Sequence, residues 1–357
     1  MVEFPVVETE GTPYEIGLQH GRKAQKQIRA CFERLCPVGE RTQERRQHAG
    51  EIERQIAERM PAALEEMHGI ADGARQPYED ILLMNLSVEL WQEDLYMPRR
   101  NCTIIGVAGA EPLVAKTIDV SPGDDRYIIC HQVKPQSGYD FLHLTYAGTV
   151  WTDGGVNGAG LAQSNSSLES NQCNWAGFPV FIMARYLLQT CSSVSEALSV
   201  AECFEGINSG GNVLLGDSSG DFVVLEKTVS QAVRRLKEDT KADGQVGEII
   251  FATNHSVTEE MEPLLGGSEA LLTNSRHRFD NLTVLARDVK RDLEGTFSFL
   301  RNHTSPGGLC QHGQGALHTV GAFVGSPKRA MLWIARGYPC ESEFASIKLC
   351  AATGEGE

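Results

Sequence analysis

The chain of 357 residues changes character near residue 103. Before that point it is helix-like: from Pro61 to Ala74 the residues Leu64, Met67, Ile70 and Ala71 recur every three or four positions, which predicts one buried stripe. After that point, short β-rich runs are separated by Gly, Asp, Asn and Ser. We therefore expect a mainly helical N-terminal segment followed by a sheet-rich body.

The sheet-rich body also contains helix-like stretches between its strands. These stretches run from Pro179 to Thr190, from Val194 to Cys203 and from Ser275 to Val289. Because a sheet must cover its apolar faces, packed sheets with helices outside them follow from this order. No internal repeat or proline-rich linker marks a second domain, so we predict a single α+β unit.

Charge and hydropathy exclude two classes of partner. The net charge of −15 argues against nucleic acid, because proteins that bind its phosphates present a basic face. No apolar run approaches the roughly 20 residues that span a bilayer. The first residues lack a basic region followed by an apolar stretch. From these observations we expect a cytoplasmic protein without a membrane partner.

Cys102 lies where the helical segment gives way to the first strands. A cysteine at such a junction is more often a packed hydrophobe than a nucleophile. The bond between Asn101 and Cys102 is, however, chemically suited to attack by the Cys102 thiol on the preceding carbonyl. Local chemistry alone leaves both interpretations open.

Six short motifs occur in order along the chain. They are Glu10-Gly-Thr-Pro-Tyr-Glu-Ile-Gly-Leu-Gln-His-Gly, Cys102-Thr, Lys116-Thr-Ile-Asp, Gly155-Val-Asn-Gly-Ala-Gly-Leu-Ala, and Ala252-Thr-Asn-His followed by Asn274-Ser-Arg-His-Arg-Phe. Each motif is weak alone, but together they span roughly residues 8 to 340. In this order the chain resembles the acyl-coenzyme A:6-aminopenicillanic acid acyltransferase family, which is also classed as a self-processing cysteine peptidase family.

The resemblance implies a four-layer αββα sandwich of the N-terminal-nucleophile (Ntn) hydrolase type. It also implies self-cleavage between Asn101 and Cys102, giving an α fragment of residues 1–101 and a β fragment of residues 102–357 that stay together as one folded heterodimer. In such enzymes the new α-amine is the base. An α-amine titrates near ~7.7–8.0, so it can accept a thiol proton close to neutral pH.

The resemblance also assigns roles to residues around Cys102. Asp119 corresponds to the carboxylate that orients the Cys102 amine, and Lys116 to a basic residue near the nucleophile. Asn254 and Asn165 are candidate donors for the oxyanion, since one such donor contributes ~2.7–4 kcal/mol. Arg276 is a candidate for a polar network near Asp119. Without the resemblance, each would be read as a turn residue or an exposed side chain.

Departures from the family pattern weaken the inference about the substrate more than the inference of self-cleavage. Asn101 stands where the family's acyltransferase has Gly, Ile104 replaces a hydroxyl residue, and Ile118 replaces an aromatic residue. We therefore expect a small-molecule acyl amide or acyl-coenzyme A substrate, with transfer to water or an amine. The donor itself stays open, no cofactor is expected, and higher oligomers remain compatible.

Three rival interpretations remain. Gly216-Asp-Ser-Ser-Gly matches a serine-hydrolase elbow around Ser218, but that elbow needs a strand before it and a helix after it, whereas strand-like runs flank it here. Cys310, His312 and His318 lack the spacing of structural zinc ligands, so no metal is predicted. A member of the fold that never matures would instead be a binding or structural protein.

Overall fold

The structure is a computed structural model that describes residues 4–37, 39, 41–90, 101–204, 206–236, 245–246, 248–312 and 317–349. The helices are α1 (Pro13–Lys23), α2 (Gln25–Leu35), α3 (Gln43–Arg59), α4 (Pro61–Ala74), α5 (Tyr78–Asn85), α6 (Ser87–Leu90), α7 (Val180–Thr190), α8 (Val194–Glu202), α9 (Glu269–Leu285) and α10 (Leu293–Arg301). None of the helices within these residues is both long and apolar enough to cross a bilayer.

Two sheets form the centre of the molecule. The first has the order β1-β4-β5-β6-β7-β8-β9-β10, and the second has the order β11-β12-β2-β3-β13-β14-β15. Strands of the first sheet are β1 (Val6–Gly11), β4 (Ile128–Pro135), β5 (Phe141–Tyr146), β6 (Gly154–Asn157), β7 (Leu161–Ser167), β8 (Gly211–Asp217), β9 (Phe222–Lys227) and β10 (Ala232–Leu236). Strands of the second are β2 (Asn101–Val107), β3 (Leu113–Val120), β11 (Gln245–Val246), β12 (Ile249–Ala252), β13 (His318–Ser326), β14 (Met331–Arg336) and β15 (Ala345–Lys348).

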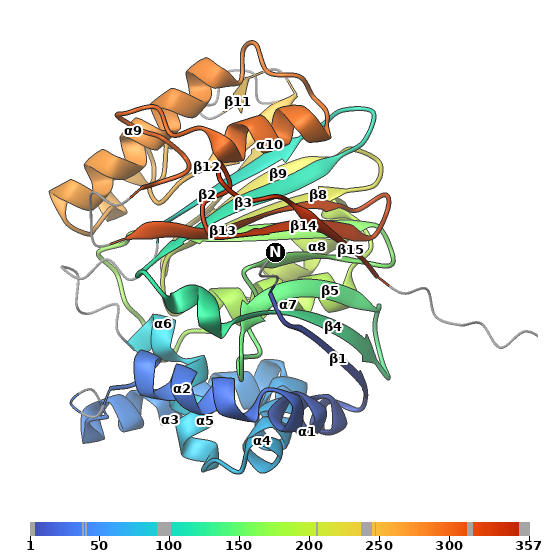
Figure 1. Cartoon of the computed structure of the whole chain (residues 1–357). Coiled ribbons are helices and arrows are strands. Elements are labelled where there is room, and N and C mark those ends of the chain that lie inside the picture. The colour runs from blue at the N-terminus through green and yellow to red at the C-terminus, as the bar shows by residue number, and fades with distance from the viewer. Residues whose placement is uncertain are drawn as a thin grey trace, which may run out of the picture.

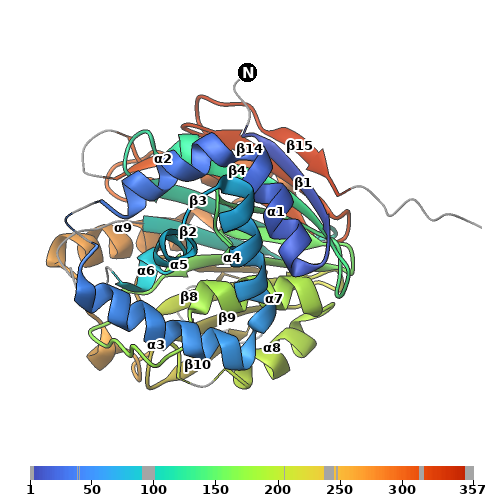
Figure 2. The ribbon, with the colours of Figure 1, turned by 90° about the horizontal axis from the view of Figure 1, so that it is seen from below.

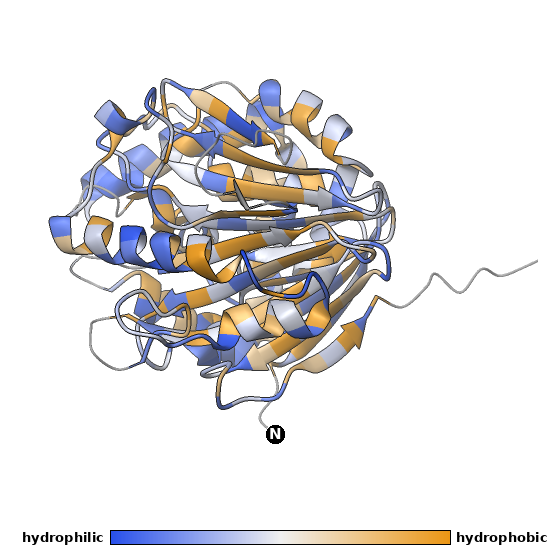
Figure 3. Cartoon of the chain, turned by 90° about the horizontal axis from the view of Figure 1, so that it is seen from above, coloured by the Kyte–Doolittle hydropathy of each residue, from blue (hydrophilic) through white to orange (hydrophobic). Residues whose placement is uncertain are grey.

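Helices cover the outer face of each sheet, so the expected αββα sandwich is confirmed (Figure 1). Helices α9 and α10 pack on the second sheet. The N-terminal helices lie below the first sheet, with α7 and α8 beside them (Figure 2). Colouring by hydropathy shows largely apolar strands in the middle layers and helices with polar outer surfaces (Figure 3). The apolar strand faces therefore form the core.

The N-terminal segment is bound to the body by more than helix packing. Strand β1 pairs in parallel with β4, so the segment contributes an edge strand that the helical pattern did not predict. The reason is that Val7 and Thr9 alternate with exposed residues in a run too short to stand out. The His20 ring accepts a hydrogen bond from the Gly148 N–H at 3.0 Å, which ties α1 to the loop after β5.

The opening motif is explained by close contact between α1 and α4. A Cβ at Gly17 would lie 2.0 Å from the Glu66 main-chain oxygen, and one at Gly21 would lie 2.5 Å from that of Ile70. Only glycine allows these two helices to approach so closely. Thr12 caps α1 and exchanges hydrogen bonds with Glu15, which fixes where the helix begins. This motif serves the fold rather than the chemistry.

Candidate functional site

Cys102 is buried in β2, and both its main-chain N–H and its carbonyl oxygen form hydrogen bonds with side chains. Its N–H donates to Asn254 Oδ1 at 3.0 Å, and its carbonyl oxygen accepts from Arg278 Nη1 at 2.6 Å. Residue 254 continues the line of β12, whose Ala252 pairs with Ile104 of β2. The Asn254 side chain therefore takes the place of a main-chain partner at the end of the ladder.

Arg278 is fully buried and connects several of these groups. Its Nη1 also donates to Thr103 Oγ1 at 2.8 Å, its Nη2 to Asn254 Oδ1 at 2.8 Å, and its Nε to Asn274 Oδ1 at 2.9 Å. Because both Nη2 and the Cys102 N–H can only donate, the Asn254 amide must present its oxygen to them. Burial lowers the pKa of Arg278, while the charges of Asp119 and Cys102 oppose that shift.

Asp119 is buried at the end of β3 and accepts three hydrogen bonds. Its Oδ1 accepts from Thr319 Oγ1 at 2.6 Å, and its Oδ2 from Gln311 Nε2 at 2.7 Å and from Thr117 Oγ1 at 3.3 Å. Burial raises the pKa of Asp119, and the charge of Arg278 together with these donors counteracts that rise. Asp119 thus lies in a pre-formed polar network.

The side chains of Cys102 and Lys116 lie on one face of the β2–β3 pair, and that of Asp119 lies on the other. Cys102 pairs with Ile118, and Ile104 pairs with Lys116, so the Cys102 and Lys116 side chains occupy diagonal positions on the face toward the first sheet. Asp119 falls on the opposite face, toward α9 and α10. The Cys102 and Asp119 side chains therefore do not share a face; among the hydrogen bonds of the described residues, Asp119 reaches β2 through Thr117 Oγ1, which accepts from the Thr103 N–H at 3.2 Å. The orientation of the Cys102 amine by Asp119 stays a prediction.

Lys116 is buried and paired rather than exposed to solvent. Its ammonium group donates to Asp153 Oδ1 at 2.6 Å and to Asn165 Oδ1 at 3.4 Å. The Asn165 amide nitrogen donates to the Thr152 carbonyl at 2.6 Å. The structure therefore joins Lys116 and Asn165 in one buried cluster, with Asp153 as a partner that the motifs did not identify.

Arg276 does not take the place expected for it. It is exposed on α9, whereas Arg278, two residues later, reaches the network near Asp119. A helix turns about 200° in two residues, so the two side chains point to opposite sides. The pattern of Leu271, Ser275 and Phe279 on the buried side of α9 was the available signal, since position 278 lies on that same side.

Asn101 is bonded to the same network from the other side. Its side-chain amide donates to Asn274 Oδ1 at 3.2 Å, and in the ladder it pairs with Asp119. Asn274 also lines an open hollow of about 610 Å³ next to α9. Solvent can therefore approach the Asn274 side of the network that holds the Asn101–Cys102 bond.

Comparison with known families decides the relationship. The family model described as "Acyl-coenzyme A:6-aminopenicillanic acid acyl-transferase" matches residues 107–339, which is most of the chain. The chain belongs to this family. The match begins five residues after Cys102, so membership rests on the sheet-rich body and leaves the nucleophile to be argued from the site.

Relatives of this acyltransferase family member include a hydrolase and an acyltransferase. The chain is 26% identical over 226 residues to the beta-alanyl-dopamine/carcinine hydrolase of Drosophila melanogaster, covering 55% of this chain and 56% of that protein. It is 25% identical over 270 residues to the 40 kDa form of the acyl-coenzyme A:6-aminopenicillanic-acid-acyltransferase of Emericella nidulans, covering 72% of each. The chain thus spans little more than half the length of the fly enzyme.

Solved structures similar to this family member have lower identity. Penicillin V acylase from Agrobacterium tumefaciens is 18% identical with a TM-score of 0.45, covering 66% of this chain and 82% of that one. An N-acylethanolamine-hydrolyzing acid amidase orthologue from Caenorhabditis elegans is 14% identical with a TM-score of 0.46, covering 64% and 93%.

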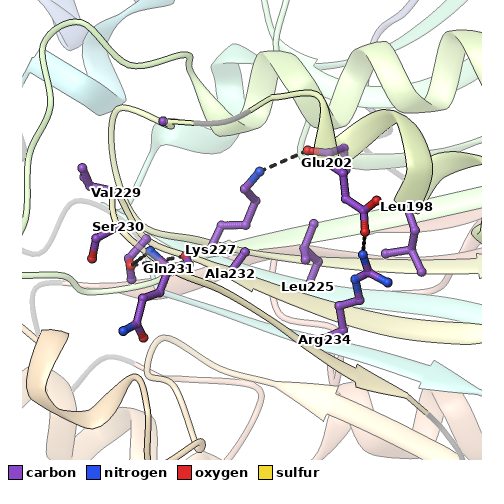
Figure 4. A pocket seen from close by; sticks show the side chains of 12 residues that line it. Leu198, Glu202, Leu225, Lys227, Val229, Ser230, Gln231, Ala232 and Arg234 are labelled. Carbon is purple, nitrogen blue, oxygen red and sulfur yellow. Dashed lines mark hydrogen bonds and ion pairs between the residues drawn. The ribbon is translucent and has the colours of Figure 1, made fainter.

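Two other regions of the described residues were candidates for the functional site: the turn at Ser218 and a pocket beside α8. Ser218 lies in an exposed turn between β8 and β9, which confirms the hairpin and excludes the strand-turn-helix elbow there. A pocket between α8, β9 and β10 is lined by residues such as Lys227 and Arg234 (Figure 4). Its lining includes none of the residues bonded to Cys102, so we do not assign the chemistry to it.

Proposed function

We propose that the chain is an autoproteolytically activated cysteine amidohydrolase or acyltransferase. The Cys102 thiol is the nucleophile and the Cys102 α-amine is the base. The observation that carries this proposal is the bonding of the Cys102 main chain, with Asn254 at its nitrogen and Arg278 at its carbonyl. Family membership supports the reaction class, because its named relatives cleave or transfer acyl groups.

The activating step is an attack of the Cys102 thiol on the Asn101 carbonyl carbon. The peptide C–N bond breaks as a thioester forms, and the thiol proton passes to the departing Cys102 nitrogen. Water then hydrolyses the thioester, which releases the Asn101 carboxylate and frees both the thiol and the α-amine. The Asn254 oxygen 3.0 Å from this nitrogen would hold the new amine in place.

In the mature enzyme the neutral α-amine takes the thiol proton. The thiolate attacks the substrate carbonyl, the ammonium group returns a proton to the leaving amine or thiol, and an acyl-enzyme remains. Water or an acceptor amine then displaces the acyl group from the sulfur. The Arg278 charge next to Cys102 favours the thiolate electrostatically.

In this proposal Asn254 has a role other than the oxyanion donor expected of it, whereas Asn165 keeps the expected role. The Asn254 nitrogen donates to the Ser167 carbonyl and hydroxyl, both at 2.9 Å, while its oxygen faces Cys102. Asn254 is therefore assigned to holding the amine. Asn165 lies with Lys116 on the thiol side of β3, and we keep both as candidate contacts to the developing negative charge.

The substrate proposed is a linear N-acyl amide or an acyl-coenzyme A thioester. The two curated relatives support this class, since one is named for hydrolysing β-alanyl amines and the other for transferring an acyl group from coenzyme A. Asn101 and Ile104 depart from the acyltransferase pattern, so we do not propose a penicillin as the natural product.

After cleavage, residues 1–101 and 102–357 are proposed to remain one folded unit. Three buried connections support this: β1 pairs with β4, the Asn85 side chain accepts from the Val150 N–H at 2.7 Å, and Glu66 forms an ion pair with Arg185 at 2.7 Å. All three lie away from the cleaved bond.

The test uses the full chain as expressed. Intact mass should show two fragments that meet at Cys102, which elute together in size-exclusion chromatography. Cys102→Ala should remain uncut and inactive toward a panel of N-acyl amines, while Cys203→Ala at the exposed end of α8 should behave like the unsubstituted chain. An uncut chain that turns over no substrate would favour a non-maturing binding protein instead.

A further inference from the structure

Side chains of metal-ligating types from two loops meet at one end of β13. His303 follows α10, Cys310 and His312 precede β13, and Cys340 follows β14. One ligand atom from each of His303, His312 and Cys340 lies within 4.8 Å of the others. Cys310 Sγ is 3.6 Å from Cys340 Sγ, so a second sulfur adjoins the same group.

Two of the distances within this group fall in the range between ligands of one tetrahedral ion, and the third is shorter. Cys310 Sγ is 3.4 Å from His312 Nε2, and His312 Nε2 is 3.0 Å from Cys340 Sγ. With Zn–S near ~2.3 Å and Zn–N near ~2.0–2.1 Å, tetrahedral ligand atoms lie about 3.3–3.8 Å apart. The two sulfurs are too far apart for a disulfide, whose S–S bond is about 2.05 Å.

The outer nitrogens of both histidines face acceptors. His303 Nδ1 is 3.1 Å from the Arg301 carbonyl oxygen, and His312 Nδ1 is 4.0 Å from Glu341 Oε1. A histidine that binds a metal usually directs its other N–H to a carbonyl or a carboxylate, which fixes the tautomer. The contact at His303 leaves the Nε2 lone pair of that ring for an ion, and His312 Nε2 already lies beside both sulfurs.

The two loops are held in place by hydrogen bonds that need no metal. The Cys310 N–H donates to the Asn302 carbonyl at 2.7 Å, and Arg301 Nε donates to the Pro339 carbonyl at 3.4 Å. The Tyr338 ring stacks on His312 with centroids 4.0 Å apart. The ligands are therefore positioned before binding, which reduces the entropic cost of assembling a site.

We propose that Cys310, Cys340, His312 and His303 bind one Zn²⁺ ion. Binding would release the two thiol protons to solvent and leave two thiolates whose charge balances that of the ion. Four protein ligands close the coordination sphere, so the ion is structural and does not take part in the acyl chemistry. Sequence spacing did not indicate this site because Cys340 lies far along the chain from the other three residues; His318, which had been considered with Cys310 and His312, contacts Tyr338 Oη at 2.8 Å instead.

The ion would stabilise the loop that reaches the Cys102 network. Gln311 lies between two of the ligands and donates its amide nitrogen to Asp119 Oδ2 at 2.7 Å. The Gln311 main-chain N–H also donates to Thr319 Oγ1, which contacts the other oxygen of Asp119. Metal binding should therefore keep both donors on Asp119.

The experiment titrates Co²⁺ and then Zn²⁺ into the full chain after reduction and removal of metal with a chelator. We expect one Co²⁺ ion per chain, with thiolate-to-cobalt charge-transfer and intense tetrahedral d–d absorption that Zn²⁺ abolishes. Because the ion binds the native state, Zn²⁺ should also raise the melting temperature. The double variant Cys310→Ala/Cys340→Ala should lose the absorption, and Cys203→Ala should keep it.

Thiol labelling of the unsubstituted chain gives an answer even if the double variant does not fold. Zn²⁺ should protect Cys310 and Cys340 from iodoacetamide without changing the labelling of Cys203, as read by peptide mass. Three results would overturn the proposal: no thiolate-to-cobalt band, the same band in a folded double variant, or a Cys310–Cys340 disulfide in the purified chain with no metal uptake after reduction.

Discussion

Arg278 Nη1 lies 2.6 Å from the carbonyl oxygen of Cys102, although the two residues are 176 positions apart in the chain. Through its other nitrogens the same guanidinium holds Asn254 and Asn274. Asn274 in turn accepts a hydrogen bond from Asn101. One buried cation therefore contacts, directly or through one amide, both residues of the bond proposed to be cleaved.

Substituting Arg278→Lys should slow both self-cleavage and turnover. Lysine keeps the charge but cannot reach several acceptors with one planar fork. Loss of one charge-assisted hydrogen bond costs about 1.5–3 kcal/mol, which corresponds to about a tenfold to a hundredfold lower rate. Rates can be measured as the cleaved fraction on denaturing gels and as kcat/KM. Arg276→Lys, exposed on the same helix, should change neither; an equal loss in both variants would contradict the assignment.

Asn254→Asp should move the pH dependence of the mature enzyme upward. A carboxylate next to the Cys102 amine favours the ammonium form, so it raises the pKa of the amine. Only the neutral amine can accept the thiol proton, so the rising limb of kcat/KM should shift by about one pH unit to higher pH. Asn281→Asp, which is on α9 and contacts Asn302, is the control. An unshifted profile would show that Asn254 does not hold the amine.

Residues on regular periodic elements could be predicted from the sequence, and residues brought together by separate loops could not. Helix α4 begins and ends at the residues that its apolar stripe predicted. In contrast, Asp153 follows no periodic pattern and is recognised only because Lys116 points at it. Arg278 was predictable in principle, since the buried stripe of α9 includes position 278 and excludes 276.

Strand alternation explains why the motif residues Lys116 and Asp119 lie close together without sharing one face of β3. The motif places Asp119 three residues after Lys116, and an odd separation puts the two side chains on opposite faces of β3. The same alternation puts Lys116 on the Cys102 side. Proximity in a motif therefore does not establish which side chains share a cavity.

The Lys116–Asp153 pair allows structural and functional roles to be separated. Both side chains are almost completely buried, so Lys116→Met alone removes the buried cation 2.6 Å from Asp153 and should destabilise the chain by about 3–5 kcal/mol. The double variant Lys116→Met/Asp153→Leu should regain most of that stability in urea denaturation. Its cleavage and turnover should stay low, because Lys116 shares a face with Cys102. Recovery of activity together with stability would show a structural role only.

Acid should unfold the protein partly through His20. Burial lowers the pKa of His20 from 6.5 to about 3, and the ring accepts a hydrogen bond from the Gly148 N–H, so the folded state requires the neutral form. The unfolded chain takes up the proton first as the pH falls. The stabilising contribution is thus complete above pH 6.5 and is lost progressively toward pH 3.

The size of this effect for one histidine is about 3 kcal/mol at pH 4. His131 and Arg185 lie next to His20, and burial also holds the pKa of His131 well below its usual value, so His131 should add to the decline. His20→Gln keeps an acceptor for Gly148 without a titrating group, and it should flatten the loss of unfolding free energy between pH 6.5 and pH 4. His277→Gln, exposed on α9, should leave the slope unchanged. Equal slopes for His20→Gln and the unsubstituted chain would show that acid acts elsewhere.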